Sequence, residues 1–126
     1  MFELQVEAEF CAAHTLTIAG TPEPVHGHNF RVSVALEGPT LDADGLLCDF
    51  HAVEAALAQV LAPLTNIPLN SHPAFARVNP SAENLAAHIA RTLSERLSTS
   101  LPPGGRVAWV RVTEAPRCAA VYHMPR

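Results

Sequence analysis

The chain has 126 residues, of which 48% are hydrophobic and 16% charged, and a formal net charge of -4. This length suits one domain, residues 1–126, with a real hydrophobic core, and the composition excludes a disordered chain. The 8 basic residues are scattered, which argues against nucleic acid or an anionic membrane as a partner. Three cysteines without a pairing motif, and no secretory signal or long apolar run, favour a cytoplasmic protein. The low charge content also predicts apolar surface buried between subunits of a homo-oligomer.

The first predicted elements are two β-strands joined by a loop. Residues 2–10 and residues 28–37 alternate apolar and polar side chains, as half-buried strands do. Residues 15–25 between them are rich in glycine and proline and predict an irregular loop. Glu23 stands between two prolines of that loop, so its carboxylate can be held near a metal at little further entropic cost. A solvated loop glutamate is the commoner case.

Three histidines lie at the facing ends of these strands. His14 follows the first strand, and His26 and His28 lead into the second. Residues two apart on a strand face the same side, so His26 and His28 can aim at one point that an imidazole from the neighbouring strand completes. Three protein ligands with a fourth position open are typical of catalytic zinc. On spacing alone, surface or core histidines explain the pattern equally well.

Two amphipathic helices are predicted in the middle of the chain. Asp49 is the expected N-cap of the first, whose apolar stripe begins at Phe50 and which Pro63 ends. Ser81 is the expected N-cap of the second. Residues 64–80 between them carry several prolines and predict a long irregular segment with a functional or interface role.

Four further side chains are interpreted as structural. His88 lies off the apolar stripe of the second helix and is predicted to be exposed. Cys11, Cys48 and Cys118 are predicted to be small buried hydrophobes. Cys11 also precedes His14 by three residues, so an extended strand directs the two side chains to opposite faces.

Two final strands complete the predicted fold. Residues 106–114 and 117–124 have strand composition, and the short link between them favours a hairpin. The order of elements is strand, strand, helix, helix, strand, strand. It predicts an α+β fold in which two helices cover one face of a four-stranded antiparallel sheet.

Five stretches together carry a family resemblance: residues 10–14, 26–30, 49–50, 79–85 and 113–114. In this order they resemble the 6-pyruvoyl-tetrahydropterin synthase and 6-carboxytetrahydropterin synthase family over almost the whole chain. The resemblance implies the T-fold, ββααββ, whose subunits form trimeric barrels that stack into hexamers. It also implies zinc on His14, His26 and His28.

The resemblance further implies a pterin substrate anchored by Glu114. A carboxylate accepts paired hydrogen bonds from the amino and ring N–H groups of a pterin, although a strand-end surface charge is the ordinary alternative. Family members act on 7,8-dihydroneopterin triphosphate. Zinc would hold its side-chain hydroxyls and lower their pKa.

The sequence departs from the family pattern in its proton-transfer groups. The usual catalytic cysteine shortly before His-Gly-His is missing, and Thr65 and Asn66 replace an Asp-His pair. Neither residue relays protons at neutral pH. In one family variant, similar to enzymes of folate synthesis that form 6-hydroxymethyl-7,8-dihydropterin, a glutamate replaces the cysteine at the position of Glu23. His72 is a weaker candidate for a second proton carrier.

Three functional hypotheses remain. The first is a zinc-dependent lyase in which Glu23 is the base for retro-aldol cleavage of the pterin side chain. The second is the 6-carboxytetrahydropterin synthase reaction of queuosine synthesis, against which the missing cysteine and Asp-His pair argue. The third is a non-catalytic protein that binds pterin and zinc but has lost the proton relay.

Overall fold

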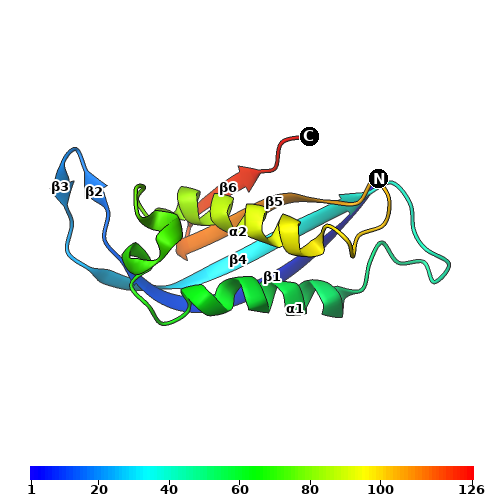
Figure 1. Ribbon diagram of the computed structural model, residues 1–126, viewed down its shortest axis with the longest axis horizontal. Coiled ribbons are helices and arrows are strands. Elements are labelled where there is room, and N and C mark those ends of the chain that lie inside the picture. Colours follow the sequence, from blue (N-terminus) through cyan, green and yellow to red (C-terminus); the bar gives the residue numbers. More distant parts are fainter.

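The computed structural model describes residues 1–126 and confirms the predicted α+β architecture. Four strands form one antiparallel sheet in the order β1-β4-β5-β6. They are β1 (Phe2–His14), β4 (His26–Gly38), β5 (Arg106–Ala115) and β6 (Cys118–His123). Two helices, α1 (Phe50–Leu61) and α2 (Ala82–Leu97), lie side by side on one face of this sheet (Figure 1). Neither helix combines the length and hydropathy that a membrane span needs.

The β1–β4 pair is longer than the alternating pattern predicts. Its antiparallel register runs from Phe2 opposite Gly38 to His14 opposite His26 without a break. The last residues of β1, Cys11 to Ala13, are small, so side-chain alternation there gives little signal although the backbone pairing continues. The extension carries His14 and His26 onto the sheet, beside His28 of the predicted strand 28–37.

The hydrophobic core lies between the sheet and the helices. Inward residues of β4 such as Phe30, Val32 and Val34 are fully buried against the apolar stripes of α1 and α2. Phe50 is an exception to the predicted stripe, because its side chain is 47% exposed and the buried residues of α1 begin at Val53. The other face of the sheet carries no helix (Figure 1).

Both predicted N-caps are confirmed. Asp49 Oδ1 accepts a hydrogen bond from His51 N at 2.9 Å, and Ser81 Oγ accepts one from Asn84 N at 3.2 Å. Each satisfies a backbone donor that the first turn of a helix leaves free. The start of α2 lies beside the end of β1, where His14 Nδ1 is 2.8 Å from Pro80 O (Figure 1).

The segment 15–25 is more ordered than predicted. It contains a small hairpin of β2 (Thr17–Ile18) and β3 (Thr21–Pro22). Ala19 and Gly20 form its turn with φ values of 51° and 83°. Positive φ at both central residues matches the twist of the flanking strands, but alanine is an uncommon choice for the first of them. That choice hid the hairpin from the sequence.

The segment between the helices is only partly irregular. It contains three short 3₁₀ turns, Ala62–Leu64, Leu69–Ser71 and Pro73–Phe75. Between the first two turns the chain runs along β1, where Asn66 N donates to Cys11 O at 2.6 Å and Ala13 N donates to Ile67 O at 3.1 Å. The 64–80 segment therefore covers the free edge of β1 near the histidines.

The predictions for the cysteines and for His88 need correction. Cys11 and Cys118 are exposed, because Cys11 points from the helix-free face of the sheet and Cys118 begins the edge strand β6. Cys48 is half-buried, and burial raises the pKa of its thiol. His88 is not an exposed residue of α2 but is half-buried beside Phe75, with ring centroids 5.6 Å apart.

Candidate metal centre and adjoining carboxylates

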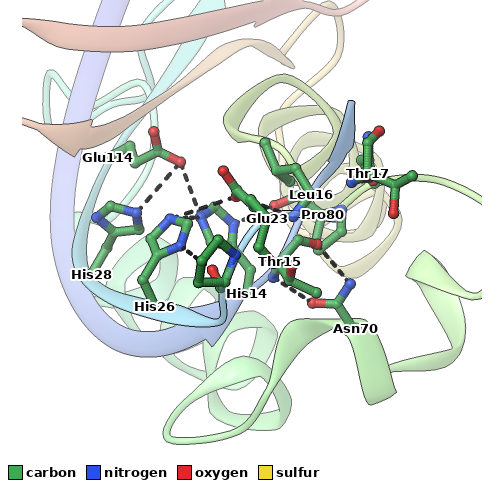
Figure 2. Close-up of polar contacts among 12 residues, drawn as sticks. His14, Thr15, Leu16, Thr17, Glu23, His26, His28, Asn70, Pro80 and Glu114 are labelled. Atoms are coloured by element: carbon green, nitrogen blue, oxygen red, sulfur yellow. Dashed lines mark hydrogen bonds and ion pairs between the residues drawn. The ribbon is translucent and has the colours of Figure 1, made fainter. Parts of the chain in front are cut away.

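The three predicted histidines converge on the core face of the sheet, at the end where α2 begins (Figure 2). His14 and His26 are directly opposite each other on β1 and β4, and His28 follows two residues later on the same face. One ring nitrogen from each lies within 4.8 Å of the other two. The cross-strand register therefore assembles a cluster that could hold a metal ion.

Backbone carbonyls fix the tautomers of two of these rings. His14 Nδ1 lies 2.8 Å from Pro80 O, and His26 Nδ1 lies 2.9 Å from Pro24 O. A carbonyl only accepts, so each Nδ1 carries the proton and each Nε2 presents a lone pair to the cluster. These two Nε2 atoms are 3.1 Å apart. Two facing lone pairs repel, whereas ligands of a tetrahedral metal with bonds of about 2.0–2.1 Å stand at about this separation.

His28 supplies the second argument for a metal. Its Nε2 is buried and has no hydrogen-bond partner. An unpaired buried polar atom costs free energy unless something occupies its lone pair. Burial lowers the pKa of His28 below its ordinary value of 6.5, although the nearby Glu114 carboxylate opposes the shift. The ring is thus held in the neutral form that binds metals, and the donor set of three imidazoles fits a metal ion.

Glu114 reaches the same cluster from β5. It follows Val110 and Val112 on the core face of the strand, and it is the extra residue of a bulge in the β5–β6 pairing. Its Oε1 lies 3.3 Å from His14 Nε2 and 3.8 Å from His28 Nε2. The side chain is 30% exposed, so the carboxylate touches both the histidines and solvent.

Glu23 reaches the cluster from the β2–β3 hairpin. Its Oε1 lies 3.7 Å from His26 Nε2 and accepts a hydrogen bond from Leu16 N at 3.1 Å. Its backbone N donates to Leu16 O at 2.9 Å, and the hydroxyl of Thr15 donates to Glu23 O. One hydrogen bond from Leu16 thus holds the carboxylate, and two further bonds to residues 15 and 16 hold the backbone of Glu23 beside the site (Figure 2).

The remaining candidates lie elsewhere. His72 contacts Phe75 and His88, with ring centroids 5.9 Å and 5.4 Å away, and its Nδ1 accepts from Ala74 N at 3.1 Å. These contacts occupy His72 away from the three histidines. The structure therefore brings together the five principal predicted residues, His14, Glu23, His26, His28 and Glu114, and leaves His72 out.

Residues 3–125 match the family model described as 6-pyruvoyl tetrahydropterin synthase. The chain belongs to the 6-pyruvoyl tetrahydropterin synthase family. It is 29% identical over 109 residues to a protein of Archaeoglobus fulgidus provisionally named 6-carboxy-5,6,7,8-tetrahydropterin synthase, covering 86% of this chain and 84% of that one. It is also 29% identical over 99 residues to 6-pyruvoyl tetrahydrobiopterin synthase of Poecilia reticulata, covering 77% and 64% of the two chains.

Solved structures of family members share the fold. The 6-pyruvoyl tetrahydropterin synthase of Caenorhabditis elegans superposes with a TM-score of 0.81 at 20% identity, covering 98% of this chain and 96% of that chain. The Plasmodium vivax enzyme gives a TM-score of 0.77 at 24% identity, with 98% and 97% covered. One further P. vivax structure carries an alanine in place of a glutamate described as the catalytic residue. These likenesses confirm the T-fold.

Two open cavities adjoin His28, and residues of the four-stranded sheet supply most of the lining of each. One, of about 570 Å³, includes Cys11, His28 and Asn66 in its lining. The other, of about 480 Å³, includes His28, Arg31 and Glu114. Asn66 takes a positive φ of 59° there, a conformation that asparagine tolerates better than most residues. A ligand beside His28 therefore has room on two sides.

Sequence reasoning missed the groups that orient two of the candidate metal ligands, His14 and His26. Pro24 and Pro80 act through their carbonyl oxygens, and a backbone carbonyl leaves no trace in residue identity. The family resemblance of residues 79–85 marked this stretch as important, but it did not predict the contact between Pro80 O and His14. The orientation of the imidazoles thus became visible only in the structure.

Proposed function

We propose that the protein is a zinc-dependent lyase that acts on the side chain of 7,8-dihydroneopterin triphosphate, with Glu23 as general base. The reaction is a retro-aldol cleavage that releases 6-hydroxymethyl-7,8-dihydropterin. One observation carries the proposal: the Glu23 carboxylate stands 3.7 Å from a histidine of the candidate metal centre, and the loop before His26 contains no cysteine.

His14, His26 and His28 would hold the zinc ion. The orphaned Nε2 of His28 and the fixed tautomers of His14 and His26 support this assignment. When bound, the ion would act as a Lewis acid toward the side-chain hydroxyls of the substrate. A divalent ion also removes the repulsion between the facing lone pairs.

Glu114 would bind the pterin ring. It is partly exposed, lines a cavity of about 480 Å³ and has a free carboxylate oxygen, which supports a role as acceptor for two N–H donors. Its position 3.3 Å from His14 Nε2 keeps the ring close to the metal centre. The reacting side chain would then have to reach the histidines and Glu23.

Glu23 would move the proton. Its carboxylate takes the proton of the hydroxyl on the second side-chain carbon, that carbon becomes an aldehyde, and its bond to the first carbon breaks. The electron pair moves into the dihydropterin ring, and the protonated Glu23 returns the proton to the first carbon. Leu16 N–H occupies Oε1, so Oε2 is the oxygen left for this transfer. A well-placed base contributes about 10²–10⁴ in rate.

The glutamate described as catalytic in the P. vivax protein supports this choice of base on the same fold. The named A. fulgidus relative favours a second candidate, the 6-carboxytetrahydropterin synthase reaction. Thr65 and Asn66 argue against it, because Thr65 Oγ1 already donates to Leu61 O at 2.8 Å and neither side chain is a base. The same two residues fit a third candidate, a pterin- and zinc-binding protein without activity.

Incubation of the zinc-loaded protein with 7,8-dihydroneopterin triphosphate, followed by mass spectrometry of the products, tests the proposal. We expect 6-hydroxymethyl-7,8-dihydropterin and a two-carbon aldehyde bearing the triphosphate. A carboxy- or pyruvoyl-tetrahydropterin product would replace the proposal with a synthase reaction. Tight binding without any product would leave the non-catalytic candidate.

A further inference from the structure

The short segment that joins His14 to the hairpin is held by two asparagine side chains. Thr15 N donates to Asn70 Oδ1 at 2.9 Å, and Asn70 Nδ2 donates to Thr15 O at 2.8 Å (Figure 2). Asn79 makes the same pair of bonds with Thr17, at 2.9 Å and 3.0 Å. Each primary amide thus replaces the peptide group of a neighbouring strand.

The opposite edge of this segment holds Glu23. In extended backbone, residues two apart present their N–H and C=O groups to one edge and the residue between them presents its groups to the other. Thr15 and Thr17 therefore face the asparagines, while Leu16 faces Glu23 and bonds both its carboxylate and its backbone N. The carboxylate and the two amides are connected through three residues of backbone.

Core packing does not hold this hairpin. All four residues of β2 and β3 are exposed, and a two-stranded hairpin alone is marginally stable in water. The asparagines themselves are well anchored. Asn70 follows the fully buried Leu69, and Asn79 O accepts a bond from Asn84 Nδ2 at 2.8 Å in the first turn of α2.

We infer that Asn70 and Asn79 are positioning residues that set the Glu23 carboxylate against the three-histidine site. Only a side chain that both donates and accepts can pair with the N–H and the C=O of one residue at once, which asparagine does at both places. Asn79 also precedes Pro80, whose carbonyl orients His14. One stretch of chain therefore orients a proposed metal ligand and the proposed base. The inference rests on the proposed function for the role of Glu23.

Backbone hydrogen exchange, followed by NMR, tests the positioning without any assay of activity. In Asn79→Ala the amide of Thr17 loses its acceptor directly, so faster exchange at Thr17 does not test the inference. The informative amide is that of Leu16, which no asparagine touches and which the Glu23 carboxylate protects. We expect its exchange to accelerate at least tenfold in Asn79→Ala and in Asn70→Ala. Unchanged protection of Leu16 in both variants would overturn the inference.

A kinetic cycle then connects the positioning to the reaction. We expect Asn79→Ala or Asn70→Ala to lower kcat about tenfold or more with little change in KM, and to have no further effect when Glu23→Gln is already present. Equal additional loss in the Glu23→Gln background would mean that the asparagines act through stability alone and would overturn the inference. Gln59→Ala is the matched control. It removes an exposed side-chain amide whose hydrogen bond is to Arg96, away from the site.

The two proposals fail in different ways. If Glu23→Gln retains full turnover, Glu23 is not the base and the proposed function is wrong, while the exchange of Leu16 still decides whether the asparagines place its carboxylate. If Glu23→Gln is inactive and both asparagine variants are fully active and fully protected at Leu16, the proposed function stands and the positioning role is wrong.

Discussion

Two regions supply groups to the candidate site, and different forces hold them. One is the pair of facing strand ends in β1 and β4, and the other is the β2–β3 hairpin. His14 is fully buried, and an uninterrupted register from Phe2 to His14 fixes its place opposite His26. The hairpin is exposed and depends on hydrogen bonds from single side chains. The candidate site therefore combines histidines fixed by a sheet with a carboxylate that is fixed by a few polar contacts.

This difference suits the two kinds of chemistry. A metal ion needs ligand atoms held near their bonding distances, and the fixed register of a paired sheet limits how far such atoms can move. A general base must approach the substrate and return a proton, so its carboxylate benefits from solvent access during the entry of substrate. Loss of a histidine should then affect metal binding, and changes in the hairpin should affect only the rate.

Removal of a histidine from the sheet has the largest expected effect. We expect His14→Ala to abolish turnover and to weaken zinc binding by more than the about 10- to 100-fold that loss of an outer-shell partner costs. Competition with a chromophoric chelator measures the affinity. His123→Ala, at an exposed position in β6, is the control. Unaltered zinc affinity in His14→Ala would show that the metal binds elsewhere.

Substitution of the proposed base, Glu23, separates the two regions. Glu23→Gln keeps a carbonyl oxygen for Leu16 N–H, so the hairpin should persist, but the side chain no longer accepts a proton. We expect kcat to fall by about 10²–10⁴ while zinc affinity stays within a factor of two or so of the unmodified protein. Single-turnover kinetics and chelator competition give the two values. Glu54→Gln, on the exposed face of α1, controls for the loss of one charge.

A third substitution distinguishes pterin binding from both metal binding and proton transfer. Glu114→Gln retains the shape of the side chain but loses the charged acceptor for paired N–H donors. Hydrogen bonds to charged groups contribute about 1.5–3 kcal/mol, so we expect pterin affinity to fall about 10- to 100-fold. Fluorescence titration with a dihydropterin measures it. If zinc affinity falls by as much as pterin affinity, Glu114 serves the metal centre instead of the ring.

The sequence predicted the sheet-borne part of the site far better than the hairpin-borne part. Alternation in β1 and β4 located the strands, and the spacing of His26 and His28 predicted a shared face. The hairpin was read as an irregular loop, because Ala19 is not a usual residue for its turn. Tertiary contacts such as Asn70 to Thr15, 55 residues apart, have no counterpart in local sequence patterns.

Burial was the other property that local patterns predicted poorly. Cysteine is apolar enough for a core, but Cys11 lies on the helix-free face of the sheet and Cys118 lies on the edge strand β6. Both side chains are therefore exposed. His88 was assigned to the surface from its helical phase, yet the 64–80 segment folds over that side of α2 and brings Phe75 and His72 against it. Which faces are covered depends on how a long connection packs, and composition does not encode that path.

The His88 cluster allows a smaller test in the apoprotein, away from both site regions. Burial lowers the pKa of His88 below 6.5, and the neighbouring His72 and Arg91 lower it further, while Glu95 opposes the shift. With a folded pKa below the unfolded one, the unfolded chain binds more protons between the two values. Stability is therefore complete above about pH 6.5 and is lost as pH falls through the folded pKa.

We expect His88→Gln to remove part of this acid sensitivity. Urea unfolding at pH 7.5 and pH 5.5, with metal chelated, measures the change in the free energy of unfolding between the two conditions for each protein. That change should be smaller in His88→Gln than in the unmodified chain, whereas the exposed control His123→Gln should leave it the same. An identical change in all three proteins would place the acid-sensitive group elsewhere and leave His28, the other histidine with a lowered pKa, as the one to test.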